Sequence, residues 1–248
     1  MMLGRFAAAA IFLAATMSDL CAAADQRFLV LDGSWVKWGA PKWGAGASVT
    51  FAFAASPVKS PSARNCSALL PFDELAKRTG FPGQRLHDEA EAAFAAWARV
   101  SGVTFVETHA ADRADIVIGV EGNPMGRAFT NVELESSPIG EAAPATERGL
   151  TAILEPRSLQ GQPYGIRSIR KALICLNALQ KWKIGFDGNL NVYDVRYTLM
   201  HEIGHAIGLD HPGATGALMG FRYDEKQSGP VKSDSDAAQR LYGVQTAK

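Results

Sequence analysis

The chain of 248 residues carries 25 basic and 25 acidic side chains, and 47% of its residues are hydrophobic. These values are typical of a soluble globular protein, and without a long basic run the composition gives no support for a nucleic-acid partner. The length allows one large domain or two small ones, and one domain is the simpler prediction.

The N-terminal segment, residues 1–24, is predicted to be a signal peptide. Arg5 precedes the apolar run 6–17, which matches a signal-peptide core and is short for a membrane span of ~20 residues. Ala22-Ala23-Ala24 supplies small residues for cleavage. We therefore expect one exported domain over residues 25–248, in a periplasm or outside the cell, with no stable membrane insertion. An uncleaved anchor is the alternative.

Local patterns predict a strand, a long helix and two further strands in the first half of the domain. Residues 33–47 are rich in Gly and Trp and are expected to be irregular, and residues 56–84 form a proline-rich excursion with one helical turn near 72–78. Side-chain composition and the spacing of apolar residues predict the helices and strands of this part. These are a strand at 48–54, a helix at 85–100 and strands at 103–107 and 114–120. This order suggests a mixed sheet with a helix on one face.

The second half begins with a long irregular region. Residues 121–170 are rich in Gly, Pro and Glu, and short strands are expected near 127–130 and 150–154. The patterns that follow predict a short apolar run, a turn and a long helix, at 172–177, 187–189 and 193–208. Asn191 or Asp194 would cap that helix.

Two cysteines remain in the domain once Cys21 is removed with the signal peptide. Export places Cys66 and Cys175 in an oxidising compartment, where a single disulfide is plausible. Two unpaired, buried thiols are the alternative, and the sequence leaves both open. The two cysteines have no zinc-site spacing to each other.

The most informative segment is HEIGHAIGLDH, residues 201–211. His201 and His205 are four residues apart, so on a helix they share one face and can reach one metal ion. Gly208 accepts the backbone angles of a sharp turn, after which His211 can supply a third nitrogen. Three histidines and a water make a catalytic zinc site, since a structural zinc usually has four protein ligands. Histidines used only for packing or at the surface are the alternative.

Glu202 follows the first histidine and can project towards the open side of the metal. Zinc lowers the pKa of its bound water towards ~7. Glu202 would accept the proton as this water attacks a peptide carbonyl, and would pass it to the leaving amine. We therefore predict Glu202 as the general base of a peptide hydrolysis. The two other histidines, His87 and His109, show no ligand spacing and are expected to be solvated.

The segment 201–211 resembles the zinc signature of the metzincins, and Met219 in Ala217-Leu218-Met219 resembles the methionine turn that lies beneath their metal. Residues 200–211 and the closing Asp234…Leu241-Tyr242-Gly243 are similar to the matrixins of peptidase family M10, and weaker similarity covers most of 43–243. The resemblance implies an α/β (α+β) catalytic domain with a twisted, mixed five-stranded sheet, long helices, a zinc cleft and a small C-terminal subdomain. An extended peptide would bind along a sheet edge.

The chain departs from the matrixin pattern at several positions. Pro212 is closer to the serralysin group, but Phe221 stands where a serralysin has an extra tyrosine ligand. Gly220-Phe221-Arg222-Tyr223 replaces the matrixin proline and would wall the pocket for the substrate residue just after the scissile bond. The histidines of a second, structural zinc are missing, as are a large prodomain and a cysteine switch, so the resemblance implies a bacterial-type enzyme with one zinc. Calcium is common in the family and could use Asp187-Gly188-Asn189.

We therefore predict a secreted, monomeric, zinc-dependent endopeptidase that acts on polypeptides. His201, His205 and His211 would hold one catalytic Zn²⁺. The alternatives are a catalytically silent binding protein with the same fold and a protease with a single protein target. Glu202 argues against the first, because a silent copy has no need of a general base.

Overall fold

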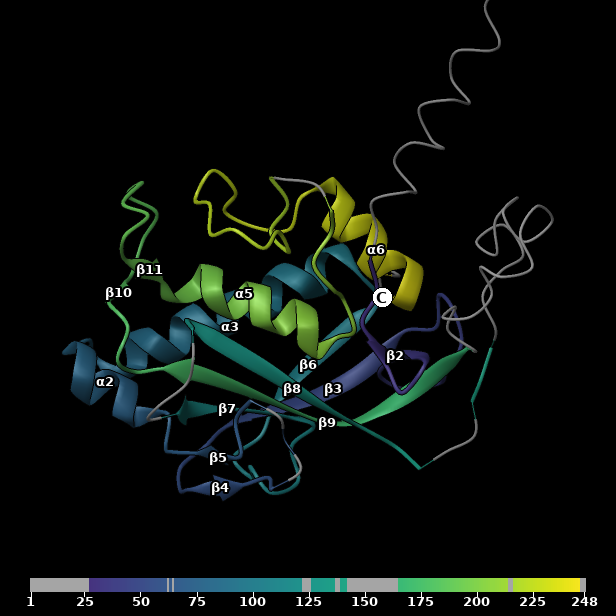
Figure 1. Cartoon of the computed structure of the whole chain (residues 1–248), viewed down its shortest axis with the longest axis horizontal. Coiled ribbons are helices and arrows are strands. Elements are labelled where there is room, and N and C mark those ends of the chain that lie inside the picture. The colour runs from purple at the N-terminus through teal and green to yellow at the C-terminus, as the bar shows by residue number, and fades with distance from the viewer. Residues whose placement is uncertain are drawn as a thin grey trace, which may run out of the picture.

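The computed structural model describes residues 27–61, 63, 65–121, 126–136, 139–141, 165–213 and 216–245 (Figure 1). The predicted signal peptide, 1–24, and the predicted strand at 150–154 lie outside these ranges. Within them, the helices lie above one face of a twisted sheet, and two short strands lie below the other face. No helix in these ranges combines the length and apolarity that crossing a bilayer requires.

Seven strands form the main sheet of the described chain. They are β1 (Val30–Leu31), β2 (Ser34–Lys37), β3 (Ala47–Phe53), β6 (Val103–Glu107), β7 (Ile116–Glu121), β8 (Ala128–Leu134) and β9 (Ile166–Asn177). Five of them give the expected mixed sheet in the order β6-β3-β7-β9-β8: the first four are parallel, and β8 pairs antiparallel with β9 at the edge. The strands predicted at 48–54, 103–107 and 114–120 are thus confirmed, and the one predicted near 127–130 is longer than expected.

The sheet is larger than the five strands that the family resemblance implies, because β1 and β2 extend it. β2 lies within residues 33–47, so the prediction that this segment is irregular is wrong there. Its residues Trp35 to Lys37 pair in parallel with Ile166 to Ser168 of β9, and all four of its residues are buried. The strand therefore depends on pairing with β9 and on burial, and neither can be predicted from the local Gly- and Trp-rich composition.

Four helices occur in the described ranges: α2 (Asp73–Thr79), α3 (Gly83–Val100), α5 (Val195–Ala206) and α6 (Lys232–Tyr242). Helices α3 and α5 lie side by side on the sheet, and Nε1 of Trp97 donates to the main-chain oxygen of Met200 at 2.7 Å. This contact joins the two helices in the middle of the core, since both residues are buried. The helices predicted at 85–100 and 193–208 are confirmed with different ends.

Both ends of α5 have a clear physical cause. At the start, the side chain of Asp194 accepts a hydrogen bond from the backbone N of Tyr197 at 2.7 Å, so Asp194 is the cap. At the end, Gly208 has a φ of 94°, and a Cβ there would lie 2.1 Å from the main-chain oxygen of Val36. Only glycine fits such a position, so the chain turns here as the sequence predicts.

Four short strands complete the architecture. They are β4 (Val58–Lys59) and β5 (Ala68–Leu69), which pair antiparallel, and β10 (Trp182–Lys183) and β11 (Tyr193–Asp194), which pair in parallel. The pair β4 and β5 lies beneath the sheet, where Cys66 and Cys175 form a disulfide across a sequence separation of 109 residues. Of the two alternatives for these cysteines, the structure therefore has the disulfide.

His109 is exposed as expected, whereas His87 is only partly exposed. The ring of His87 is half-buried, with its centroid 4.0 Å from that of Phe53 and 5.3 Å from that of Phe72. Helix α3 turns this residue towards β3, so aromatic neighbours distant in sequence cover it.

Candidate metal centre

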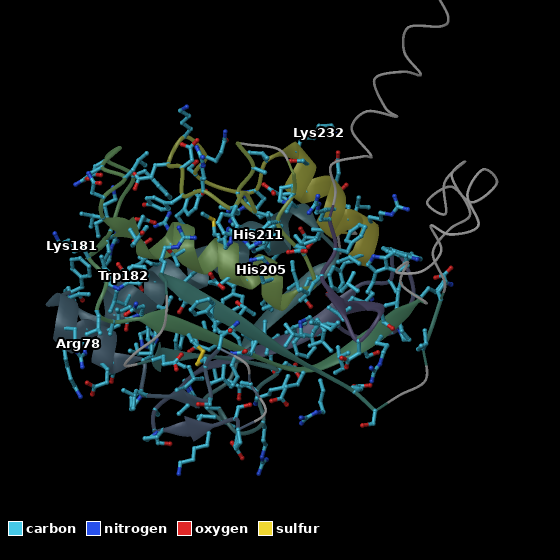
Figure 2. The ribbon with its side chains drawn as sticks, viewed as in Figure 1. Arg78, Lys181, Trp182, His205, His211 and Lys232 are labelled. Atoms are coloured by element: carbon cyan, nitrogen blue, oxygen red, sulfur yellow. A yellow bond between two sulfur atoms is a disulfide. The ribbon has the colours of Figure 1, made fainter. Side chains whose placement is uncertain are left out.

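Three histidines converge where α5 ends and the chain turns back. His201 and His205 lie one turn apart on α5, and the turn at Gly208 returns the chain so that His211 meets them. One nitrogen from each ring lies within 4.8 Å of the others, and Nε2 of His201 is 3.2 Å from Nε2 of His211. Figure 2 shows His211 close to His205, which lies on α5. The structure thus brings together all three histidines that the sequence predicts as ligands.

Hydrogen bonds fix which ring nitrogens face one another. Nδ1 of His201 lies 2.9 Å from the main-chain oxygen of Leu218, and Nδ1 of His205 lies 2.8 Å from that of Leu209. A carbonyl oxygen only accepts, so in both rings Nδ1 carries the hydrogen and Nε2 keeps its free electron pair. Carbonyl partners of this kind are the usual support for metal-binding histidines.

Burial keeps the first two histidines neutral. It lowers the pKa of His201 well below its usual value, with smaller contributions from the charges of His205 and Arg127. Burial also lowers the pKa of His205. Since a metal ligand must offer an unprotonated nitrogen, both rings are in the form that a metal requires at neutral pH.

The donor set fits zinc in a catalytic rather than a structural site. It consists of three imidazoles with free Nε2 atoms on one side and a cleft on the other, which matches three protein ligands and one open position. A second group, of Cys66, Glu121 and Cys175, also lies within metal-binding distances in the described part of the chain. Its two sulfurs are joined in the disulfide, so they are not thiolates and cannot bind an ion in this state.

Glu202 faces the cleft from α5 and is held by Thr130 on β8. The hydroxyl oxygen of Thr130 lies 2.8 Å from Oε2 of Glu202 and 2.9 Å from its main-chain oxygen. The single hydroxyl hydrogen can serve one acceptor at a time. Thr130 can therefore donate to the carboxylate, or accept from the protonated acid while donating to the main-chain oxygen. No local sequence pattern indicates Thr130, because 72 residues separate it from Glu202.

The segment that contains Met219 is held by a buried carboxylate on α6. Asp234 accepts from the backbone N of Leu218 at 2.9 Å and of Met219 at 3.2 Å, and also from Val231 at 2.9 Å. Leu218 in turn accepts from His201 through its main-chain oxygen. The closing motif at 234–243, which the sequence analysis uses only for its resemblance, thus supports the position of the first histidine.

An open cleft of about 570 Å³ runs past the histidines between β8 and the segment after Met219. Of the segment 220–223, Phe221 and Tyr223 line it. The ring of Phe221 is 83% exposed and its centroid lies 5.1 Å from that of His211. Phe221 thus presents an exposed apolar ring beside the histidines.

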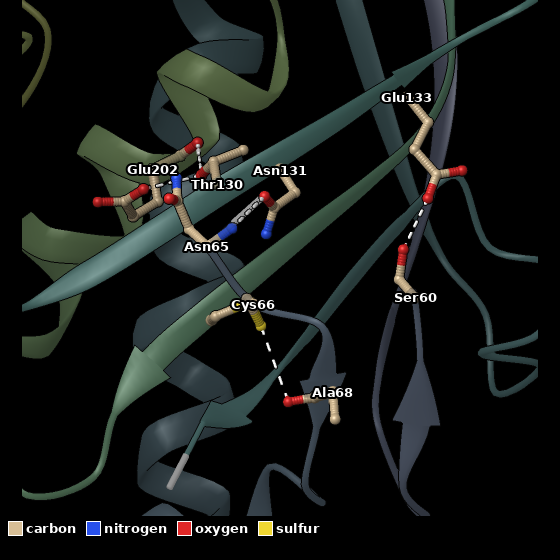
Figure 3. Close-up of a disulfide and its surroundings, with 9 residues drawn as sticks. Ser60, Asn65, Cys66, Ala68, Thr130, Asn131, Glu133 and Glu202 are labelled. Atoms are coloured by element: carbon tan, nitrogen blue, oxygen red, sulfur yellow. Dashed lines mark hydrogen bonds between the residues drawn. A yellow bond between two sulfur atoms is a disulfide. The ribbon is translucent and has the colours of Figure 1, made fainter. Parts of the chain in front are cut away.

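Two further residues of the cleft escape sequence analysis. Arg127 lies just before β8, next to the strand predicted near 127–130, and Asn65 comes from the segment beneath the sheet. The backbone N of Asn65 donates to Oδ1 of Asn131 at 3.3 Å, and the next residue, Cys66, is fixed by the disulfide (Figure 3). No local pattern could reveal either residue, because each reaches the cleft through contacts with distant strands.

The turn Asp187-Gly188-Asn189 is tied to basic and backbone groups. The ammonium of Lys183 pairs with Asp187 and with Glu225, and it donates to the main-chain oxygen of Asn189 at 2.8 Å. The Asp187 carboxylate also accepts from the backbone N of Asn189 at 2.9 Å. The segment therefore forms a closed turn in which the carboxylates are already paired with a lysine.

A mixed sheet, a helix with two histidines and a third histidine after a glycine turn fit a metzincin catalytic domain. More particularly, the chain is matrixin-like, since residues 155–243 match the peptidase family model described as Matrixin. An alignment of 73 residues is 40% identical to Serralysin A from Dickeya chrysanthemi and covers 20% of this chain and 16% of that protein. The chain therefore matches less than a fifth of the length of this relative.

Proposed function

We propose that this protein is an exported zinc-dependent endopeptidase. The observation that carries the proposal is the convergence of three Nε2 atoms with the carboxylate of Glu202 at one cleft. The similarity to matrixins and to a serralysin supports the same activity. We infer that His201, His205 and His211 hold one Zn²⁺.

The reaction divides between the metal and the side chains of the cleft. Zinc held by the three histidines would act as a Lewis acid and lower the pKa of a bound water towards ~7. Glu202 would accept the proton of the attacking water and deliver it to the leaving amine. Thr130 fits both steps, because it can donate to the carboxylate of Glu202 and accept from its protonated form.

We infer that the substrate is an extended polypeptide. β8 is an edge strand beside the cleft, so a peptide could add to it through backbone hydrogen bonds. We also propose that the protein is exported and acts as a monomer. Calcium at Asp187-Gly188-Asn189 remains a prediction as well, and it would have to displace the Lys183 ammonium from the Asp187 carboxylate.

Hydrolysis of an unbiased peptide library by the purified mature protein tests the proposal. The library is incubated with and without a zinc chelator, beside Glu202→Ala, and the cleavage sites are read by mass spectrometry. We expect chelator-sensitive cleavage that the variant lacks, with zinc still bound at one per chain in both proteins. Cleavage that persists in Glu202→Ala would exclude the assigned base, and zinc binding without any cleavage would favour a silent binding protein.

A further inference from the structure

The charge of Arg127 has no carboxylate partner among the described residues. Its guanidinium carbon lies 5.3 Å from the ring centroid of Tyr193 and 5.3 Å from that of Tyr223, so the charge is held between two aromatic faces. Its Nε is buried and makes no hydrogen bond. A guanidinium that is partly removed from water and lacks an anion gains strongly from one.

The position of this side chain is fixed by the sheet rather than by a loose loop. The main-chain oxygen of Arg127 accepts from the backbone N of Asn177 on β9 at 3.0 Å, which extends the pairing of β8 and β9 by one residue. The backbone and the two tyrosine rings thus direct the guanidinium into the cleft that His201 and Glu202 also line. A preorganised donor of this kind can select a ligand without first losing conformational freedom.

The two acidic groups that line the same cleft have other partners. The carboxylate of Glu202 is held by Thr130, and Oδ1 of Asp210 accepts from the backbone N of His211 at 2.8 Å. Arg127 is therefore the charged group of the described cleft that a bound peptide can pair with. A planar guanidinium binds a carboxylate through two parallel hydrogen bonds, whereas an amide of the same shape offers only one acceptor oxygen.

We propose that Arg127 makes this cleft selective for a substrate carboxylate next to the cleaved bond, from an Asp or Glu side chain or from the C-terminus of the peptide. The inference rests on the proposed function and adds the substrate class. It predicts a preference for acidic peptides, although the walls contributed by Phe221 and Tyr223 are aromatic. A charge-assisted pair of this kind corresponds to a discrimination of about 10-fold to 100-fold against the matching amide.

The experiment compares matched peptides that are C-terminally amidated and differ by Glu or Gln at one position flanking the cut. A Gln peptide with a free C-terminus forms a third arm and distinguishes the two sources of the carboxylate. Rates are measured with the wild type, and binding is measured with the zinc-loaded Glu202→Ala protein. We expect Glu to exceed Gln by about tenfold or more at one position, and Arg127→Met to remove this difference while zinc content stays at one per chain.

Arg222→Met is the matched control, because it removes a neighbouring exposed cation that does not line the cleft. It should keep the ratio of Glu to Gln, and Arg127→Gln replaces the methionine variant if that one does not fold. The inference would be overturned if the wild type cleaved and bound the Glu peptide, the Gln peptide and the peptide with a free C-terminus equally well. It would also be overturned if the ratio of Glu to Gln stayed the same in the Arg127 variant. Selective binding of acidic peptides without any cleavage would support the role of Arg127 in selectivity. It would count only against the proposed peptidase activity.

Discussion

Gly204 and Met219 are in direct contact, so the helix that carries two of the histidines rests on the methionine after the turn. A Cβ at position 204 would lie 2.2 Å from Sδ of Met219 and 3.0 Å from Cζ2 of Trp97. Met219 is only 2% exposed, which leaves its side chain little room to move. The absence of a side chain at Gly204 therefore sets the distance between α5 and the segment that supports His201.

Gly204→Ala is expected to destabilise the protein even though alanine is the better helix former. The gain in helix propensity is about 1 kcal/mol, whereas overpacking a closed core costs ~1–3 kcal/mol and would displace α5. Urea unfolding and zinc content should both reveal the loss. Gly83→Ala on α3 is the control, because a Cβ there meets no atom within 4 Å. Equal stability of the two variants would contradict the close contact.

Thr130→Val should lower kcat by about tenfold without changing the zinc content, since it removes a hydrogen bond to a charged group and keeps the shape of the side chain. Thr130→Ser retains the hydroxyl and should restore most of the rate. Both variants are compared with the wild type in steady-state cleavage of one peptide. A valine variant with full kcat would show that Thr130 only supports the fold.

Removal of the disulfide should lower the free energy of unfolding by about 5 kcal/mol on the chain-entropy model, because the bond closes a separation of 109 residues. The change is Cys66→Ala with Cys175→Ala, which avoids placing hydroxyl groups at two fully buried positions. Urea denaturation of this variant should coincide with that of the reduced wild type. A stability equal to that of the oxidised protein would indicate that the unlinked chain is constrained in another way.

Lys37 is expected to make the stability of the protein vary with pH in the alkaline range. Its ammonium is buried and donates to the main-chain oxygens of Trp38, Ala40 and Ala45 at 2.8–3.0 Å. Burial lowers its pKa from 10.5 to about 8. Between these two values the folded protein holds the neutral amine while the unfolded chain holds a proton, so unfolding takes up a proton and stability rises with pH.

Lys37→Met provides the comparison that isolates this effect from other titrating groups. The free energy of unfolding of the wild type minus that of the variant should increase from pH 8 to pH 10.5. The limit is roughly 1.4 kcal/mol per pH unit. Chemical denaturation at several pH values measures the difference. A difference that is flat or falls with pH would mean that Lys37 stays charged in the fold.

The amino-acid sequence by itself determined the local geometry of the site. His201 and His205 share a helix face because of their spacing, and Gly208 turns the chain because only glycine accepts its backbone angles there. The strands with strong apolar patterns and the two long helices were predictable for the same reason, since the periodicity of a segment reports which face it buries.

The tertiary structure decided which distant groups join that site. Thr130 on β8, Arg127 just before it and Asn65 beneath the sheet reach the cleft through pairing and packing that no local pattern contains. The pairing of Cys66 with Cys175 and the strand β2 have the same origin. Short-range rules fix helix faces and turns, whereas contacts between distant residues form only when the whole core assembles.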